Sequence, residues 1–448
     1  MANQPIATDF TEVTDLDVDE FIDLETSAPA APIFKSQPRQ AAEAVRAEKR
    51  VGFLAQLDRP FLLVVLMLVA IGCMMVYSTT FDWSYQEYGS ESVIFMQHLR
   101  NLGIGMFALV VMTIIDYRLW RRLSVLMLLL TIGGLIAVLL FGDGTFGARR
   151  AFFQGSYQPG ELAELIIVIY MAAWLGSKNI RITSITHGLL PFAILLAIVG
   201  LPILLQPDIS TAVTIFIVAG IMFFLAGANI WHLVGALAAM GVAGWAVIQF
   251  ISYAGGRVSA FVNSLTDITQ ADYHAQQAMI AFYNGGWFGV GLGQGRQKFG
   301  YLPVPHTDSI FAVIGEELGV VGAMFVVTLY VILVIRGLSI ARKADNAFGA
   351  LLAAGVTLWI ATKALMNIAV MLNLLPSTGV ALPFVSFGGS SLVTVLAGAG
   401  ILLSISRITS RRALAASERK KGDVQRADRG WGNRGSRVSG AGNQRGRA

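Results

Sequence analysis

Long apolar blocks constrain this chain more than any other feature of its sequence. A helix needs roughly 20 apolar residues to cross a bilayer, and about ten such segments follow one another along the chain. Only 14% of the 448 residues are charged, whereas a soluble domain carries about 25%. The alternating pattern of a membrane β-barrel is absent. The sequence therefore predicts an all-α, polytopic membrane protein with about ten transmembrane helices. Their expected cores are 60–80, 102–115, 124–141, 162–177, 188–205, 209–227, 230–252, 308–336, 349–372 and 386–405.

Lys and Arg in the short loops predict the orientation of these helices, because cytoplasmic loops are enriched in both. The basic loops 116–122, 177–181 and 336–343 fall on the side opposite to the segment 81–92, which has neither Lys nor Arg. The basic C-terminal tail shares the side of the basic loops. We therefore expect both termini in the cytoplasm and a large extracytoplasmic loop, 253–307, between helices 7 and 8.

The two ends of the chain are poor in large apolar residues, which is typical of disorder. Residues 1–57 are expected to form a cytoplasmic tail, in which the stretch 9–25 holds eight carboxylates and no Lys or Arg. The transmembrane domain is expected at 58–405, followed by a basic, disordered cytoplasmic tail at 406–448. Solvation explains both tails, and the alternatives are attraction of the basic tail to anionic lipid and docking of a partner by either tail.

Carboxylates in and beside an apolar segment are the clearest sign of a functional site. The stretch HTDSIFAVIGEELG at 306–319 contains Asp308, Glu316 and Glu317. Insertion of an ionised carboxylate at the bilayer centre costs roughly 2.5–3.5 kcal/mol, so the presence of these residues requires a functional or structural explanation. Asp308 could be a first-turn carboxylate that backbone N–H groups satisfy, with Thr307 as the helix cap. A catalytic role is the alternative.

A second group of charges lies in the linker GARRAFFQGSYQPGELAEL. Arg149 and Arg150 are expected outside, against the positive-inside trend, where they either snorkel at the interface or bind an anion through guanidinium–phosphate pairs. The helix dipole can satisfy Glu161 in a first turn, but Glu164 lies one turn deeper and needs a partner. Lys363, in the middle of another span, needs a carboxylate or phosphate partner. A pair with Glu164 across the bundle would satisfy both residues, and the alternative is that Lys363 faces a phosphate in an outer cavity.

Glycine and proline mark two further segments. Four alternate glycines at 289–295 have no strand before them and no Gly-Lys-Ser/Thr after them, so a nucleotide loop is rejected. They are expected to let the backbone pass close to a ligand or to helices, with Arg296 and Lys298 adding positive charge. The segment 374–392 has two prolines and three glycines, and such backbone at membrane depth must line a cavity or be covered by protein. The five histidines lack metal-ligand spacing, and the single cysteine, Cys73, excludes an intramolecular disulfide.

These motifs, in this order, resemble the SEDS family (shape, elongation, division and sporulation). The matching stretches are GARR…QPGELAEL, QPDIST, GGWFGVGLGQGRQKFGYLPVPHTDSIFAVIGEELG and LLPSTGVALPFVSFGGSSL. The resemblance covers about residues 60–405. The form STGVALPF and the long charged N-terminal tail are more similar to the division branch, FtsW, than to the elongation branch, RodA.

The resemblance implies a peptidoglycan glycosyltransferase of cell division. Such a protein polymerises lipid II, a disaccharide-pentapeptide on undecaprenyl diphosphate, on the outer face of the cytoplasmic membrane at the septum. The implied partners are a class B penicillin-binding protein, which cross-links the product, and other divisome proteins, but no nucleic acid. Asp308 falls at the family's catalytic aspartate and is assigned as general base. The candidate substrate contacts are Arg149, Arg150, Glu161, Arg296, Gln297, Lys298, His306 and Ser390.

The chemistry agrees with these residue types. A sugar hydroxyl must attack an anomeric carbon that carries a lipid diphosphate, which requires a base near the hydroxyl and positive charge near the leaving group. The donor is already activated, so no cofactor is identified, and a divalent cation would leave no sign in the sequence. A lipid II flippase and a non-catalytic division scaffold are the alternatives. The chain also departs from the family, which usually has Lys at Glu164, Ser at Gly160, Gln at Lys363, Phe at Ser309 and Tyr at Phe387.

Overall fold

The computed structural model describes residues 53–142, 151, 158–177, 182–232 and 252–432, together with single positions between 233 and 244. The chain divides into two compact units, Met1–Arg50 and Val51–Ala448, and every described residue belongs to the second. The acidic stretch 9–25 lies outside the described residues, as does most of the expected span 230–252.

The described part of the chain is helical and contains no β-strand. Its long helices are α2 (Arg59–Tyr88), α3 (Val93–Ile114), α4 (Arg118–Phe141), α5 (Pro159–Leu175), α6 (Leu190–Leu205), α7 (Ile209–Leu225), α9 (Ser252–Ser264), α10 (Tyr273–Gly285), α11 (Ile310–Lys343), α12 (Ala347–Met371) and α13 (Ser390–Gly432). Short helical turns lie at Phe53–Ala55, Ile185–Leu189 and Ile268–Gln270.

Seven helices of the described residues are long and apolar enough to cross a membrane: α2, α3, α4, the continuous stretch Ile185–Leu205 that contains α6, α11, α12, and α13 as far as Ser417. Two further expected spans are α5 and α7, with 17 residues each. At 1.5 Å per residue they are about 25 Å long, shorter than the hydrocarbon core of about 30 Å. Both begin at the cavity described below.

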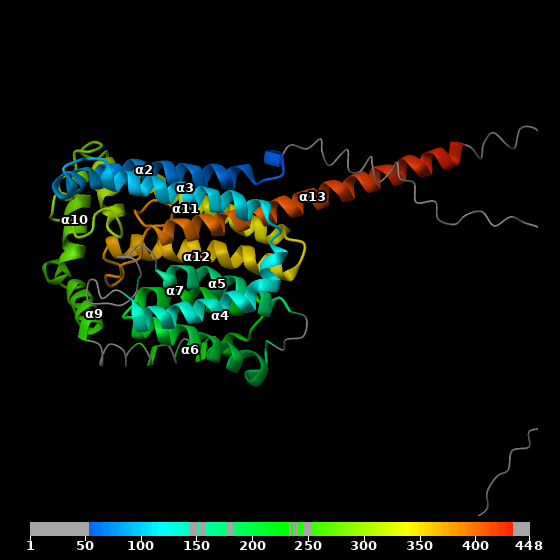
Figure 1. Cartoon of the computed structure of the whole chain (residues 1–448), viewed down its shortest axis with the longest axis horizontal. Coiled ribbons are helices and arrows are strands. Elements are labelled where there is room, and N and C mark those ends of the chain that lie inside the picture. The colour runs from blue at the N-terminus through cyan, green and yellow to red at the C-terminus, as the bar shows by residue number, and fades with distance from the viewer. Residues whose placement is uncertain are drawn as a thin grey trace, which may run out of the picture. The chain divides into compact units, whose positions relative to one another are not determined.

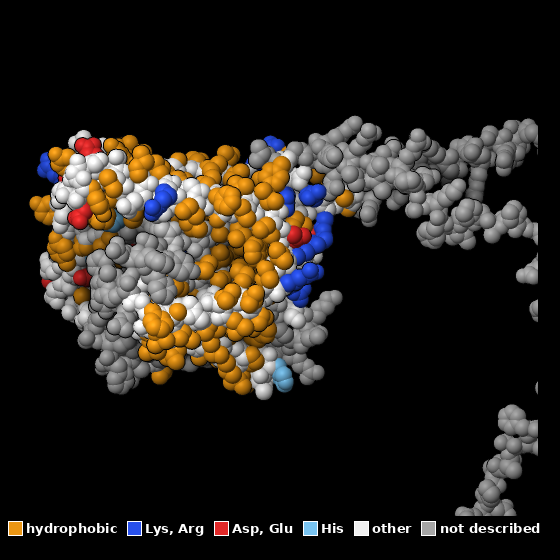
Figure 2. All heavy atoms as spheres, in the orientation of Figure 1, with side chains coloured by type: hydrophobic (Ala, Val, Ile, Leu, Met, Phe, Trp, Pro, Cys, Tyr) orange, Lys and Arg blue, Asp and Glu red, His pale blue; other side chains and the backbone are white. Residues whose placement is uncertain are grey.

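The helices run side by side, with α9 and α10 across one end of the bundle and α13 leaving at the other (Figure 1). Helix α11 packs against α2, α10 and α12, and α13 packs most extensively against α3. Small residues allow the last contact. A Cβ on Gly105 would meet Leu396 Cδ1 at 2.5 Å, and one on Gly400 would meet the Leu109 carbonyl at 2.5 Å. On the face that Figure 2 shows, apolar side chains cover the middle of the bundle, and Lys and Arg gather at the α13 end.

The last helix differs from the expected disordered tail at 406–448, because α13 continues without a break to Gly432. Arg407 donates to the Ile114 carbonyl at 2.7 Å, and Arg412 lies 3.1 Å from an Asp345 carboxylate oxygen. The first part of the tail is therefore fastened to the bundle. Low hydrophobicity predicted disorder, but the run RRALAASERKK consists largely of strong helix formers and continues a helix that already exists.

Candidate functional site

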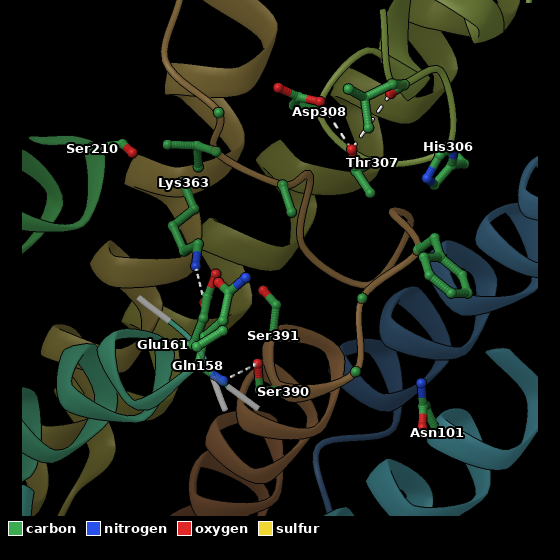
Figure 3. A pocket seen from close by; sticks show the side chains of 18 of the residues that line it. Asn101, Gln158, Glu161, Ser210, His306, Thr307, Asp308, Lys363, Ser390 and Ser391 are labelled. Carbon is green, nitrogen blue, oxygen red and sulfur yellow. Dashed lines mark hydrogen bonds and ion pairs between the residues drawn. The ribbon is translucent and has the colours of Figure 1, made fainter. Parts of the chain in front are cut away.

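A cavity of about 510 Å³ lies at the α10 end of the bundle. Its walls come from α2, α3, α5, α7 and α12, and from the segments 304–308 and 379–391. Figure 3 shows Asp308 and Thr307 on one side of it and Gln158 and Ser390 on the other. Six predicted site residues line it, although they are far apart in the sequence: Glu161, Glu164, His306, Asp308, Lys363 and Ser390.

The backbone around Asp308 is fixed by three consecutive carbonyl groups. The His306 carbonyl accepts from the Phe387 N–H at 2.8 Å, and the Thr307 carbonyl accepts from the Ser386 hydroxyl at 2.5 Å. The Asp308 carbonyl accepts from the Asn367 side-chain amide at 2.7 Å. Each bond comes from an element distant in the sequence, so the tertiary fold, and not the local chain, fixes the backbone that carries Asp308.

The Asp308 carboxylate is not a helix cap. Helix α11 begins at Ile310 with Ser309 as its N-cap, so the expectation that the helix starts with Asp308 is wrong. Within the described residues, the carboxylate accepts one hydrogen bond, from the Thr307 hydroxyl at 2.9 Å, and none from a backbone N–H. The turn forms instead because Ser309 donates to the Pro303 carbonyl at 2.5 Å and also bonds His274. Asp308 is thus left half-buried and facing the cavity.

One buried cation sits between two carboxylates below this turn. Lys363 Nζ lies 2.5 Å from Glu161 Oε2 and 2.8 Å from Glu164 Oε2. Trp359 Nε1 also donates to Glu164 Oε2 at 2.8 Å. The structure thus contains the ion pair that the sequence suggested between Glu164 and Lys363, and it adds Glu161 as a third member. The spacing of three residues places both glutamates on one face of α5, a signal that could have predicted the triad.

Arg100, in α3, is a cavity residue that the sequence analysis missed. Its side chain is exposed, and within the described part of the chain it forms no hydrogen bond or ion pair. A basic residue near the start of α3, on the side opposite the basic loops, breaks the positive-inside trend and could have been noticed. Arg100 therefore offers the cavity a cation that pairs with no carboxylate among the described residues.

The wall next to Asp308 is aromatic. The His306 ring stacks on Trp83 with ring centres 4.6 Å apart and 23° between planes, and it meets Phe387 edge-on at 5.6 Å. Burial lowers the pKa of His306 to about 4, so the imidazole is neutral near pH 7. Trp83 was not predicted, and nothing in the sequence near it indicated a site.

Three predicted substrate contacts lie in the glycine-rich loop, and none of them lines the cavity. Lys298 is buried and bonds Glu317 at 2.7 Å and the Ser78 hydroxyl at 2.8 Å. Gln297 is also buried, and its N–H donates to Glu316 at 3.1 Å. We had expected both side chains to contact substrate. Arg296 is exposed and, like them, is not a lining residue; its N–H donates to Glu316 at 2.9 Å.

Glu316 and Glu317 therefore have a structural explanation. Glu316 accepts backbone N–H groups of the loop, and Glu317 accepts the Gly293 N–H at 3.0 Å as well as the Lys298 ammonium. The two carboxylates fasten the glycine-rich loop to α11, at the point where Gly319 interrupts the helix with φ 69°. Buried charges of this kind persist because they are paired and hydrogen-bonded.

The irregular segment 379–391 lines the cavity, which is where non-helical backbone is tolerated at membrane depth. Within it, the Ser390 hydroxyl accepts from the Gln158 N–H at 3.3 Å. Arg149 and Arg150 lie outside the described residues. Among the described residues, no group of three His, Cys, Asp or Glu side chains is placed to hold a metal ion.

Comparison with known proteins gives a consistent result. Residues 58–411 match the model of the FtsW/RodA/SpoVE family, described as cell cycle protein. The chain is 37% identical over 358 residues to a probable peptidoglycan glycosyltransferase FtsW of Trichlorobacter lovleyi, covering 79% of this chain and 94% of that protein. It is 35% identical to the stage V sporulation protein E of Bacillus subtilis, covering 78% and 97%.

Two solved structures share the fold. One belongs to work titled "Structural coordination of polymerization and crosslinking by a peptidoglycan synthase complex", with a TM-score of 0.65 and 25% identity over 79% of this chain and 98% of that one. The other is the rod shape determining protein RodA of Thermus thermophilus, with a TM-score of 0.59 and 25% identity over 78% and 97%.

Proposed function

The chain belongs to the FtsW/RodA/SpoVE family of cell cycle proteins, which is the SEDS family that its motifs resemble, and we propose that it polymerises lipid II during cell division. It is a membrane-embedded peptidoglycan glycosyltransferase. The use of lipid II as substrate, the residues that act on it and the place of action are the parts that we propose.

The cavity carries this proposal. It is lined by the Asp308 carboxylate, which accepts no backbone N–H, and by the Arg100 guanidinium, which has no ion-pair partner among the described residues. The acceptor hydroxyl oxygen forms a bond to the donor's anomeric carbon while the bond from that carbon to the diphosphate oxygen breaks. The electron pair leaves with the diphosphate, and the hydroxyl proton passes to Asp308 as general base. Since Asp308 is not capped by backbone N–H groups, its lone pairs are available to the hydroxyl.

The leaving diphosphate needs positive charge, and Arg100 is the described residue best placed to supply it. A guanidinium binds phosphate oxygens in a bidentate manner. Lys363 is less suited, because Glu161 and Glu164 already hold its ammonium. Arg149 and Arg150 remain candidates from the sequence. No organic cofactor is proposed, because the diphosphate already activates the donor.

The flippase alternative requires a polar path to both faces of the membrane. Lys363 is the residue of α12 that lines the cavity, and it lies eight residues before Met371, where that helix ends beside the cavity. At 1.5 Å per residue this is about 12 Å, whereas the 25 residues of α12 span about 37 Å. Buried apolar side chains such as Ile360 and Val356 follow below Lys363. A one-sided cavity favours the polymerase.

We also propose the cellular setting. The similar structure of a peptidoglycan synthase complex supports a class B penicillin-binding protein as partner. Other divisome proteins, a position at the septum and cytoplasmic termini complete the proposal, with the cavity open on the outer side of the inner membrane. The distribution of Lys and Arg supports this orientation, because both gather at the end of the bundle opposite the cavity (Figure 2).

The test is glycan polymerisation from purified lipid II by the protein with its partner. Asp308→Asn keeps the size of the side chain but removes the basic site, so we expect the rate to fall at least about 100-fold, the low end for a general base. Asp267→Asn, on the exposed turn before α10, is the matched control and should leave the rate unchanged. Parallel reactions with EDTA test for a divalent cation.

Near-normal polymerisation by folded Asp308→Asn protein would refute the catalytic assignment and favour the scaffold. Failure of the wild type to polymerise, combined with lipid II transfer across vesicles, would favour the flippase.

A further inference from the structure

Trp83 occupies an unusual position near the end of α2. Its side chain is 42% exposed although it lines the cavity. The ring is also held from one side, since His306 stacks on it with ring centres 4.6 Å apart. Phe387 supports His306 from the edge. Trp83, His306 and Phe387 thus form an aromatic wall of the cavity. The part of the cavity around Lys363 is instead lined by charged groups.

An ordinary explanation for an aromatic residue at the end of a transmembrane helix is anchoring at the membrane interface. Tyr85 and Tyr88 fit that explanation, because they are 60% and 54% exposed on the same end of α2 and do not line the cavity. Trp83 differs from them in both respects that matter for a ligand: it borders the cavity, and its ring orientation is fixed by a second ring.

The chemistry of this wall suits a sugar. The faces of aromatic rings are electron-rich, and the C–H groups on one face of a pyranose carry partial positive charge, so the two surfaces stack. His306 adds hydrogen bonding. Its ring nitrogens make no hydrogen bond within the described part of the chain, and burial lowers its pKa to about 4, so it presents one donor and one acceptor at neutral pH. Sugar hydroxyl groups can use both.

We propose that Trp83 and His306 form a saccharide platform, which binds a sugar ring of lipid II beside Asp308. This inference rests on the proposed function and assigns one part of the substrate to one wall of the cavity. His306 is two residues from Asp308 in a turn that three carbonyl hydrogen bonds fix, so a ring held on this platform is placed near the proposed base.

The test compares two probes that differ only in the sugar-peptide part: lipid II and undecaprenyl diphosphate. Binding of each is measured to full-length Asp308→Asn protein, which removes turnover, with and without Trp83→Ala. An aromatic contact contributes about 0.5–1.5 kcal/mol, so we expect lipid II binding to weaken up to about tenfold. Undecaprenyl diphosphate binding should not change. Trp83→Phe should retain most of the lipid II affinity, and Tyr88→Ala is the matched control without effect.

His306→Gln provides a second variant, which removes the imidazole ring but leaves Trp83. We expect it to weaken binding of lipid II and to leave binding of undecaprenyl diphosphate unchanged. In the active protein, Trp83→Ala should raise KM for lipid II more than it lowers kcat, as loss of uniform binding does. Equal weakening of both probes would overturn the platform in favour of a structural role, and unchanged lipid II binding would also overturn it. Either result leaves the polymerase proposal standing if the wild type polymerises; failure of that wild-type control refutes the polymerase itself.

Discussion

At the scale of single residues, the most unusual feature is the triad of Glu161, Lys363 and Glu164. Lys363 is 2% exposed and Glu164 is 3% exposed. Such charges persist in an apolar bundle only because they are paired. Removal of Lys363 leaves two carboxylates without a cation, whereas removal of Glu164 leaves Lys363 paired with Glu161. Glu161 is the more accessible carboxylate, at the edge of the cavity, and can be hydrated when its partner is lost.

We therefore expect Lys363→Gln to destabilise the protein by the roughly 3–5 kcal/mol typical of a broken buried pair. Glu164→Gln should also destabilise it, but by less, because Glu161 still pairs with Lys363. Lys363→Gln should cost more, because it leaves two carboxylates side by side. The double variant should cost less than the sum of the single variants. The measurement is the thermal unfolding midpoint of all four proteins in one detergent, with Glu87→Gln, on the exposed end of α2, as control. Strictly additive losses would contradict the coupling.

At the scale of elements, the kink in α11 couples the glycine-rich loop to the bundle. Gly319 has φ 69° and ψ −172°, a conformation that L side chains rarely adopt. The Val290 and Gly291 N–H groups donate to the carbonyls of Glu316 and Glu317 at 3.0 and 3.1 Å. The kink thus leaves helix carbonyl groups free to accept hydrogen bonds from the loop. The side chains of Glu316 and Glu317 accept further N–H groups of the same loop.

Gly319→Ala should release this loop. A Cβ at Gly319 would meet the Gly289 nitrogen at 2.4 Å and the Trp287 carbonyl oxygen at 2.5 Å. Backbone strain of this kind costs about 1–3 kcal/mol before the steric clash is counted. We expect a lower unfolding midpoint and new trypsin cleavage after Lys298, which the wild type buries. Gly103→Ala, with nothing within 4 Å of the added Cβ, is the control. Unchanged protection of Lys298 in Gly319→Ala would show that the kink is not needed to hold the loop.

At the scale of the whole molecule, the folded unit extends beyond the expected limits of 58–405. Gln56 and Leu57 are buried before α2, and Asp58 pairs with Arg336 of α11 at 2.6 Å. At the other end, Arg412 reaches Asp345. Both attachments lie at the end of the bundle opposite the cavity, so they bear on stability and not on the proposed chemistry.

We expect a truncated protein of residues 53–417 to polymerise lipid II with its partner at the wild-type rate, because it keeps these attachments and the whole cavity. A shorter protein of residues 58–406 should be less stable, since it loses Gln56, Leu57, Arg407 and Arg412. Activity and unfolding midpoint of the two proteins in the same detergent make the comparison. Loss of activity in a stable 53–417 protein would show that a tail belongs to the working enzyme.

Much of the fold follows from local properties of the sequence. Hydropathy and length predict a membrane-spanning helix from consecutive residues alone, so nine of the ten expected spans correspond to described helices. The same locality explains the errors. The predicted end of α13 was wrong because low hydrophobicity indicates exposure to solvent, and an exposed segment can still continue a helix. The predicted start of α11 was wrong because residues distant in the sequence fix the turn at Asp308.

Local patterns were enough to predict the membrane class, the motif that contains Asp308 and the need of Glu164 and Lys363 for a partner. The cost of a charge in an apolar segment can be judged one residue at a time. Which groups meet in space is known from the packed helices alone. The tertiary structure turned Lys298 toward Glu317 and away from the cavity, and brought Arg100 and Trp83 to the cavity wall. The reason is geometric: contacts between helices depend on their packing and rotation, which no local pattern in one sequence specifies.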